Sequence, residues 1–327
     1  MTLGHGPNVS RMSEARHRPV VAVSGAIALL VALVLVLGGC GDGDAPDPAP
    51  GAARDGFDGA RAFADLRAQV ALGPRPSGSA SNRRLTADLA RQLRAAGVED
   101  VRVQRPLRNV VGLIPGRGDG YVVLGAHHDT VGGIPGFVGA NDGASGVAVV
   151  LELARSLPNP GSGPSIAIAL FDGEEARPGR DFADDGTRGS RQYVAYAETG
   201  KQGSAPIDAI AAMVLLDMVG DCDLVIPREA GSDEGLYSLF ADADPSVFDG
   251  NRPGIEDDHV NFLEAGVPAV DLIDFAYGPG PAPGDYWHTS EDSLDHVCPA
   301  SLDAVGEAAF RALPRIGAGQ IGHLVPE

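Results

Sequence analysis

Three stretches decide the fold of this chain: YVVLGAHHD at residues 121–129, SIAIALFDGEE at residues 165–175 and AAMVLLD at residues 211–217. Each is a short apolar run that ends on acidic or imidazole side chains. Short apolar runs bounded by glycine, proline and charge indicate buried strands, and the carboxyl ends of parallel strands lie along one edge of their sheet. We therefore expect the polar side chains at these three ends to lie close together.

Helices alternate with strands along the rest of the chain. We predict helices at residues 58–71, 80–96, 144–157, 188–198 and 299–312, and strands at residues 100–104, 108–114, 120–126, 165–171, 212–217 and 268–273. The first two strands are close enough in sequence to pair antiparallel. Strands that alternate with helices form right-handed crossovers, with helices on both faces of the sheet. The predicted fold class is α/β, a three-layer α/β/α architecture with a central mixed, mostly parallel sheet.

The length and composition fit one folded domain. The chain has 327 residues, 44% of them hydrophobic, which is enough to bury a single core of the α/β size class. We assign residues 55–318 to this domain and residues 319–327 to a C-terminal tail. The formal net charge of −19 argues against nucleic acid as a partner.

The N-terminus carries a targeting signal. Three arginines between residues 11 and 18 precede an apolar stretch at residues 20–37, and the following LGGC resembles the lipobox of bacterial lipoproteins. We predict a signal peptide at residues 1–39, lipidation of Cys40, and a disordered tether at residues 40–54, which are mostly Pro, Gly, Ala and Asp. The alternative is an uncleaved transmembrane anchor, because about 18 apolar residues just span a bilayer. Either interpretation places the domain outside the cytoplasm, and in the favoured one its only membrane contact is the lipid anchor.

Two cysteines remain after Cys40. Cys222 follows the predicted strand 212–217, and Cys298 follows the loop that carries His288. An oxidising compartment permits a disulfide between them. Two separate buried thiols are the alternative.

The residues at and after the first strand suit a metal site. His127 and Asp129 are two apart on an extended segment and so point the same way, which lets the Asp hold the second imidazole N–H while the ring binds metal. Asp142 lies in the turn GANDGASG at residues 139–146. It is either the cap of the following helix or a carboxylate that bridges two metals.

The other two strand ends add carboxylates, and a loop adds an imidazole. Glu174 and Glu175 are adjacent at a strand end and diverge, so that one can bind metal while the other moves protons. Asp217 ends the third strand, and His288 lies in DYWHTSED at residues 285–292. Mixed imidazole and carboxylate ligation suits zinc, with manganese or cobalt as substitutes.

Six motifs in one order resemble a known family. They are GAHHDT, GANDGASG, FDGEEA, LLDMVG, IEDDHVNFL and WHTSED, and together they span residues 58–315 with their surroundings. Their order is similar to that of the zinc exopeptidases of metallopeptidase family 28, in particular the glutaminyl cyclase branch. The resemblance implies the phosphorylase/hydrolase-like zinc exopeptidase fold and a zinc-dependent catalytic domain.

The resemblance allows two reactions on one scaffold. The two-zinc aminopeptidase pattern implies one ion on His127, Asp142 and Asp217, a second on Asp142, Glu175 and His288, Glu174 as general base, and Asp129 as the partner of His127. The glutaminyl cyclase pattern implies one zinc on Asp142, Glu175 and His288. In that pattern Glu174 shuttles a proton from the N-terminal amine of a glutaminyl peptide to the departing ammonia.

The cyclase pattern also assigns neighbours of Glu174 and a pocket wall. Asp217 and Asp258 would be hydrogen-bonded partners of Glu174, and Trp287 would line the pocket. The loop at residues 177–188 lacks the Trp of animal cyclases, and Phe182 is its only aromatic residue.

Three functions remain as hypotheses. We favour a zinc-dependent cyclase acting on peptide N-termini over a two-zinc aminopeptidase. A surface-anchored binding protein without catalysis predicts a lost ligand or base, yet the complete set is present: His127, Asp142, Glu174, Glu175, Asp217 and His288.

Overall fold

The computed structural model describes residues 56–317. The predictions for residues 1–39, Cys40, residues 40–54 and residues 319–327 lie outside the described residues. Within residues 56–317, no helix has both the length and the apolar character needed to cross a bilayer.

A six-stranded mixed sheet organises the domain, in the order β1-β2-β4-β3-β5-β8. Its strands are β1 (Glu99–Val103), β2 (Val110–Ile114), β3 (Tyr121–His127), β4 (Ser165–Phe171), β5 (Ile210–Asp217) and β8 (Ala269–Ile273). Strands β4, β3, β5 and β8 are parallel, whereas β2 is antiparallel to both β1 and β4. This confirms the mixed, mostly parallel sheet and the antiparallel pairing of its first two strands.

The long helices lie where the sequence predicts them. The structure has α1 (Gly59–Val70), α2 (Ala80–Ala95), α3 (Ser145–Ser156), α5 (Arg188–Ala197) and α8 (Pro299–Ala312), together with the unpredicted α4 (Phe182–Asp185), α6 (Glu234–Ala241) and α7 (His259–Glu264). A small parallel ladder of β6 (Arg228–Glu229) and β7 (Asn251–Arg252) is also unpredicted. These additional elements have at most eight residues, so they give no clear apolar period in the sequence.

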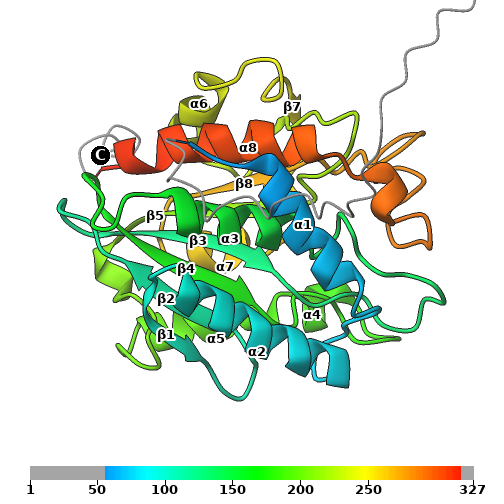
Figure 1. The fold of residues 1–327 in the computed structure, drawn as a ribbon, viewed down its shortest axis with the longest axis horizontal. Coiled ribbons are helices and arrows are strands. Elements are labelled where there is room, and N and C mark those ends of the chain that lie inside the picture. The colour runs from blue at the N-terminus through cyan, green and yellow to red at the C-terminus, as the bar shows by residue number, and fades with distance from the viewer. Residues whose placement is uncertain (1–55, 318–327) are drawn as a thin grey trace, which may run out of the picture. The chain divides into compact units, whose positions relative to one another are not determined.

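The helices cover both faces of the sheet (Figure 1). Between helices and sheet lie two clusters of buried apolar side chains. Neighbouring residues of β3 point to opposite faces, so Val122 belongs to the cluster that includes residues of α1, α2, α3 and α8, and Val123 belongs to the cluster that includes residues of α5 and α7. Burial of each large apolar side chain contributes about 1.5–3 kcal/mol. The three-layer prediction is confirmed.

The strand register aligns the carboxyl ends of the central strands. His127 pairs with Phe171 across β3 and β4, and Asp217 pairs with Ile273 across β5 and β8. The segments that leave β3, β4 and β5 therefore start at one edge of the sheet.

A disulfide joins two segments near this edge. Cys222, which follows β5, is bonded to Cys298, the residue before α8, across a sequence separation of 76. Of the two alternatives for these cysteines, the structure has the disulfide.

Candidate metal centre

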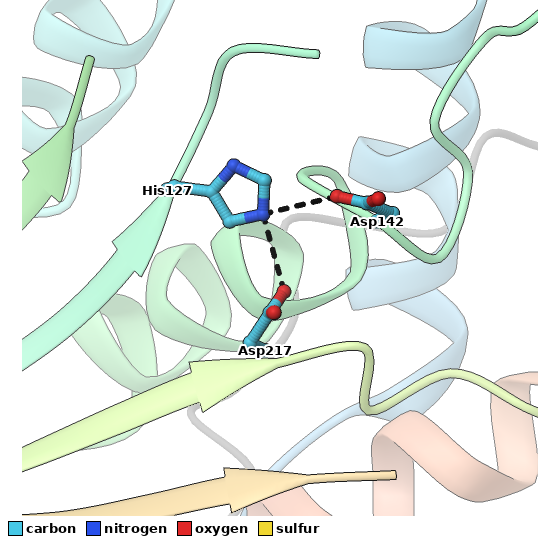
Figure 2. A group of neighbouring side chains, drawn as sticks. All are labelled: His127, Asp142 and Asp217. Atoms are coloured by element: carbon cyan, nitrogen blue, oxygen red, sulfur yellow. Dashed lines mark hydrogen bonds and ion pairs between the residues drawn. The ribbon is translucent and has the colours of Figure 1, made fainter. Parts of the chain in front are cut away.

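Three side chains converge at the ends of β3 and β5 (Figure 2). His127 is the last residue of β3, Asp217 is the last residue of β5, and Asp142 lies in the turn before α3. The Nε2 atom of His127 lies 3.2 Å from Oδ1 of Asp142 and 3.2 Å from Oδ1 of Asp217. One imidazole nitrogen and two carboxylate oxygens therefore face a common point.

A second group shares Asp142. The Nε2 atom of His288 lies 3.2 Å from Oδ2 of Asp142 and 3.4 Å from Oε1 of Glu175. The two oxygens of Asp142 thus face different imidazoles, as a bridging carboxylate does. In each group the possible ligand atoms lie within 4.8 Å of one another.

Hydrogen bonds to a buried carboxylate fix the turn that carries Asp142. Asp292 accepts hydrogen bonds from the backbone N–H groups of Asn141 and Asp142, and the Tyr277 hydroxyl donates to Asp292. Gly143 has a φ of +90°, and a Cβ there would lie 2.4 Å from the Asp129 carbonyl oxygen, so glycine alone fits. The first turn of α3 has no side-chain cap. Of the two roles considered for Asp142, the structure therefore does not have the helix cap.

Arg75 supports the same turn, and it belongs to none of the motifs that predict the site. Its guanidinium is fully buried and donates to the carbonyl oxygens of Val138, at 2.7 Å, and Gly139, at 2.9 Å. Burial lowers the pKa of Arg75 to about 10, so the group stays positively charged at neutral pH. A buried cation thus fixes the backbone that leads into Asp142.

Asp129 holds the segment after β4. Its carboxylate accepts hydrogen bonds from the backbone N–H groups of Gly173, Glu174 and Glu175. The distance from its Oδ1 to Nδ1 of His127 is 3.8 Å, longer than a hydrogen bond, and that nitrogen has no hydrogen-bond partner. The contacts of Asp129 therefore position the two glutamates more directly than they orient the imidazole.

Glu174 and Glu175 point to different members of the site. Glu175 faces His288, whereas Oε2 of Glu174 lies 3.9 Å from Nδ1 of His127. Burial raises the pKa of Glu174 well above its ordinary value, and the charges of nearby carboxylates raise it further. Burial and the charge of Asp142 raise the pKa of Glu175 to about 7. A buried carboxyl with a raised pKa is suited to proton transfer near neutral pH.

The two aspartates of IEDDH face different surroundings. Asp258 accepts a hydrogen bond from the Ser190 hydroxyl and is fully buried away from the cavity. Asp257, which was not among the predicted site residues, lines the cavity together with Glu174 and Asp217. Because Asp257 and Asp258 are adjacent acids before a short helix, the sequence alone does not predict which of them faces the cavity.

A cavity of about 650 Å³ opens above these residues. Apolar side chains form part of its wall, among them Phe182, Ile255, Phe275 and Trp287. Of these four, Phe182 and Trp287 are the two residues predicted to bind substrate. The Trp287 and His288 rings stack with centroids 3.8 Å apart, and the Phe275 ring meets Trp287 edge-on at 5.4 Å. The volume and the mixture of apolar wall and polar floor are typical of a small-ligand site.

The residues present fit zinc. Two imidazoles and three carboxylates make up the two groups, and these donor types bind zinc in proteins. Glu174 and Asp257 add two more buried carboxyl groups to the same floor. Buried carboxylates at this density need protons or cations to offset the cost of leaving water.

Comparisons with known proteins agree with this site. Residues 109–313 match the sequence pattern of Peptidase family M28, and this segment contains all five predicted metal ligands. The structure resembles the crystal structure of Acidobacteriales bacterium glutaminyl cyclase with a TM-score of 0.71 and 32% identity, covering 84% of this chain and 99% of that chain. It also resembles a Zn-dependent exopeptidase from Parabacteroides distasonis ATCC 8503 with a TM-score of 0.66 and 25% identity, covering 80% of this chain and 99% of that chain.

A glutaminyl-peptide cyclotransferase is similar in sequence over part of its length. The glutaminyl-peptide cyclotransferase of Boiga irregularis is 29% identical over 241 residues, covering 62% of this chain. The chain spans 64% of the length of that relative. Since the family pattern covers more than half of the chain and includes both groups of candidate ligands, this chain belongs to peptidase family M28.

Proposed function

We propose that this protein is a zinc-dependent glutaminyl-peptide cyclotransferase, which converts an N-terminal glutamine to pyroglutamate and releases ammonia. The observation that carries the proposal is the position of Glu174. This buried carboxyl lies on the floor of an apolar-walled cavity beside Glu175, a member of the Asp142, Glu175 and His288 group. The similarity to glutaminyl cyclases supports the same reaction.

The cavity would orient the substrate for an internal attack. Trp287 and Phe182 offer apolar surface to the methylene groups of glutamine. A folded glutamine brings its α-amine next to its own γ-amide carbon, and holding that geometry removes much of the entropic barrier. Zinc held by Asp142, Glu175 and His288 would supply a Lewis acid that stabilises negative charge on the amide oxygen.

Glu174 would move the proton that the reaction requires. The α-amine nitrogen forms a bond to the γ-carbon, and the bond from that carbon to the amide nitrogen breaks. Glu174 accepts a proton from the amine and returns it to the departing nitrogen, which leaves as ammonia. Asp217 and Asp257, which line the same floor, surround this proton with further acidic groups.

Replacement of Glu174 tests the proposal. The Glu174→Gln variant should lose cyclisation, because an amide cannot carry the proton, and should bind as much zinc as the unmodified protein. Glu256→Gln is the matched control, since Glu256 is an exposed carboxylate at the rim of the same cavity. Cyclisation by Glu174→Gln at the unmodified rate would overturn the role of Glu174.

A two-zinc aminopeptidase is the second candidate. The observation that favours it is that both ligand groups are complete and share Asp142. In this reaction Glu174 would deprotonate a water molecule that attacks the first peptide bond. Asp217→Asn separates the candidates: loss of one of two bound zinc ions supports the aminopeptidase, whereas unchanged zinc content supports the cyclase.

We also propose an extracytoplasmic location with a lipid anchor on Cys40. The support is the LGGC sequence and the Cys222–Cys298 disulfide, since structural disulfides persist in oxidising compartments. Cys40→Ala should move the protein from the membrane fraction to the soluble fraction after cell lysis. Retention in the membrane would favour the uncleaved transmembrane anchor.

A further inference from the structure

One cation in the wall of the cavity has no anionic partner within ion-pair distance. Arg252, on β7, is half-buried and lines the cavity, and its guanidinium carbon lies 4.9 Å from the centre of the Phe275 ring. Its Nε atom is buried and has no hydrogen-bond partner. Within residues 56–317, no carboxylate lies within 4.0 Å of this guanidinium, so its contact is with an aromatic face.

The other two arginines that line the cavity are either paired with a carboxylate or exposed to water. Arg177 lines the cavity too, but it forms hydrogen bonds and an ion pair with Asp185. Arg180 is exposed at the rim, where water screens its charge. Asp271, Asp274 and Glu229 attract the Arg252 guanidinium from beyond ion-pair distance. Since none of them forms an ion pair with it, a carboxylate that enters the cavity can still bind this guanidinium directly.

A continuous set of ring contacts connects Arg252 to the candidate metal centre. His288 stacks on Trp287 at 3.8 Å, Trp287 meets Phe275 at 5.4 Å, and Phe275 lies under Arg252. An extended peptide advances roughly 3.3–3.6 Å per residue. A peptide whose first residue lies at His288 and whose chain follows these rings would therefore bring its next residues toward the guanidinium.

We propose that Arg252 makes the cavity selective for peptides that carry a carboxylate at the second or third residue. The proposal rests on the proposed function, which places the N-terminal residue at His288. The carboxylate comes either from an acidic side chain or from the C-terminus of a short peptide. Arginine is suited to both, because its planar guanidinium can donate two parallel hydrogen bonds to a carboxylate.

The test compares matched peptides at about 0.15 M salt, where the screening length is about 8 Å and the net charge of the molecule matters little. One pair is Gln-Glu-Ala-Ala-amide and Gln-Gln-Ala-Ala-amide, and a second pair moves the acidic residue to the third position. A third pair is Gln-Ala-Ala as free acid and as amide. The zinc-loaded protein should show a KM about tenfold lower for the acidic member of at least one pair, with kcat little changed.

Two variants and a control assign the effect to Arg252. Arg252→Met should abolish the difference in KM, and Arg252→Lys should retain part of it because the charge remains. Arg228→Met is the control, since Arg228 lies on the neighbouring β6, donates to the Ser232 carbonyl and does not line the cavity. Arg228→Met should leave the ratio of KM values unchanged.

The outcomes separate this inference from the proposed function. Equal KM values within every pair, or an unchanged ratio in Arg252→Met, would overturn the role of Arg252. If no glutamine peptide is cyclised, the proposed cyclase fails. The preference for a peptide carboxylate can then still be measured, because calorimetry gives the dissociation constants of the same peptides with the Glu174→Gln protein. A preference in the side-chain pairs identifies an acidic residue as the source, and a preference in the third pair alone identifies the C-terminus.

Discussion

Two adjacent residues, Asp257 and Asp258, should differ sharply in what their replacement does. Asp257 lines the cavity beside Glu174, whereas Asp258 is buried and accepts a hydrogen bond from the Ser190 hydroxyl. Asp257→Asn should lower kcat by about 10²-fold, the size expected for a group that assists proton transfer. Asp258→Asn should instead lower the free energy of unfolding by about 1–3 kcal/mol. Steady-state kinetics and urea unfolding of both variants check this, and the reverse pattern would contradict the assignment.

Arg75 should matter for stability and for metal binding together. Its guanidinium donates to backbone carbonyls next to the turn of Asp142. Arg75→Met leaves these buried oxygens without a donor, which should cost about 3 kcal/mol in urea unfolding and lower the zinc affinity. Arg67→Met on the exposed side of α1 is the control. Unchanged zinc affinity in a destabilised Arg75→Met protein would show that the turn does not need Arg75.

At the scale of elements, the disulfide should stabilise the segments around the site. It ties the chain after β5 to the start of α8 across 76 residues. Closing a loop of this length removes about 4 kcal/mol of chain entropy from the unfolded state. The double variant Cys222→Ser with Cys298→Ser should unfold at lower urea, with a loss of about 2–4 kcal/mol. Equal unfolding midpoints with and without reductant would contradict this.

The sequence predicts the long elements well and the short ones poorly. Helix α2 is amphipathic with Leu85, Leu89 and Leu93 buried, and β3, β4 and β5 are continuous apolar runs. By contrast, β7 has two residues, and tertiary pairing with β6 defines it. The same limit applies to the site. The ends of long strands predict His127 and Asp217, whereas Arg75, Asp257 and Arg252 depend on contacts between distant segments.

For the whole molecule, removal of metal should lower the thermal midpoint. The floor of the cavity concentrates buried carboxyl groups that a bound cation would neutralise. A ligand at 100 times its dissociation constant stabilises the folded state by about 2.7 kcal/mol. Calorimetry should therefore give a midpoint lower by about 5–10 °C in excess chelator, restored by added zinc. Identical midpoints in chelator and in zinc would argue against a metal at this site.

The most direct test of the proposed cyclase is mass spectrometry of two peptides incubated with the purified, zinc-loaded protein. One peptide begins with glutamine and the other with leucine. We predict that the glutamine peptide loses ammonia while the leucine peptide stays intact. Release of free leucine without loss of ammonia from the glutamine peptide would contradict the cyclase and establish an aminopeptidase.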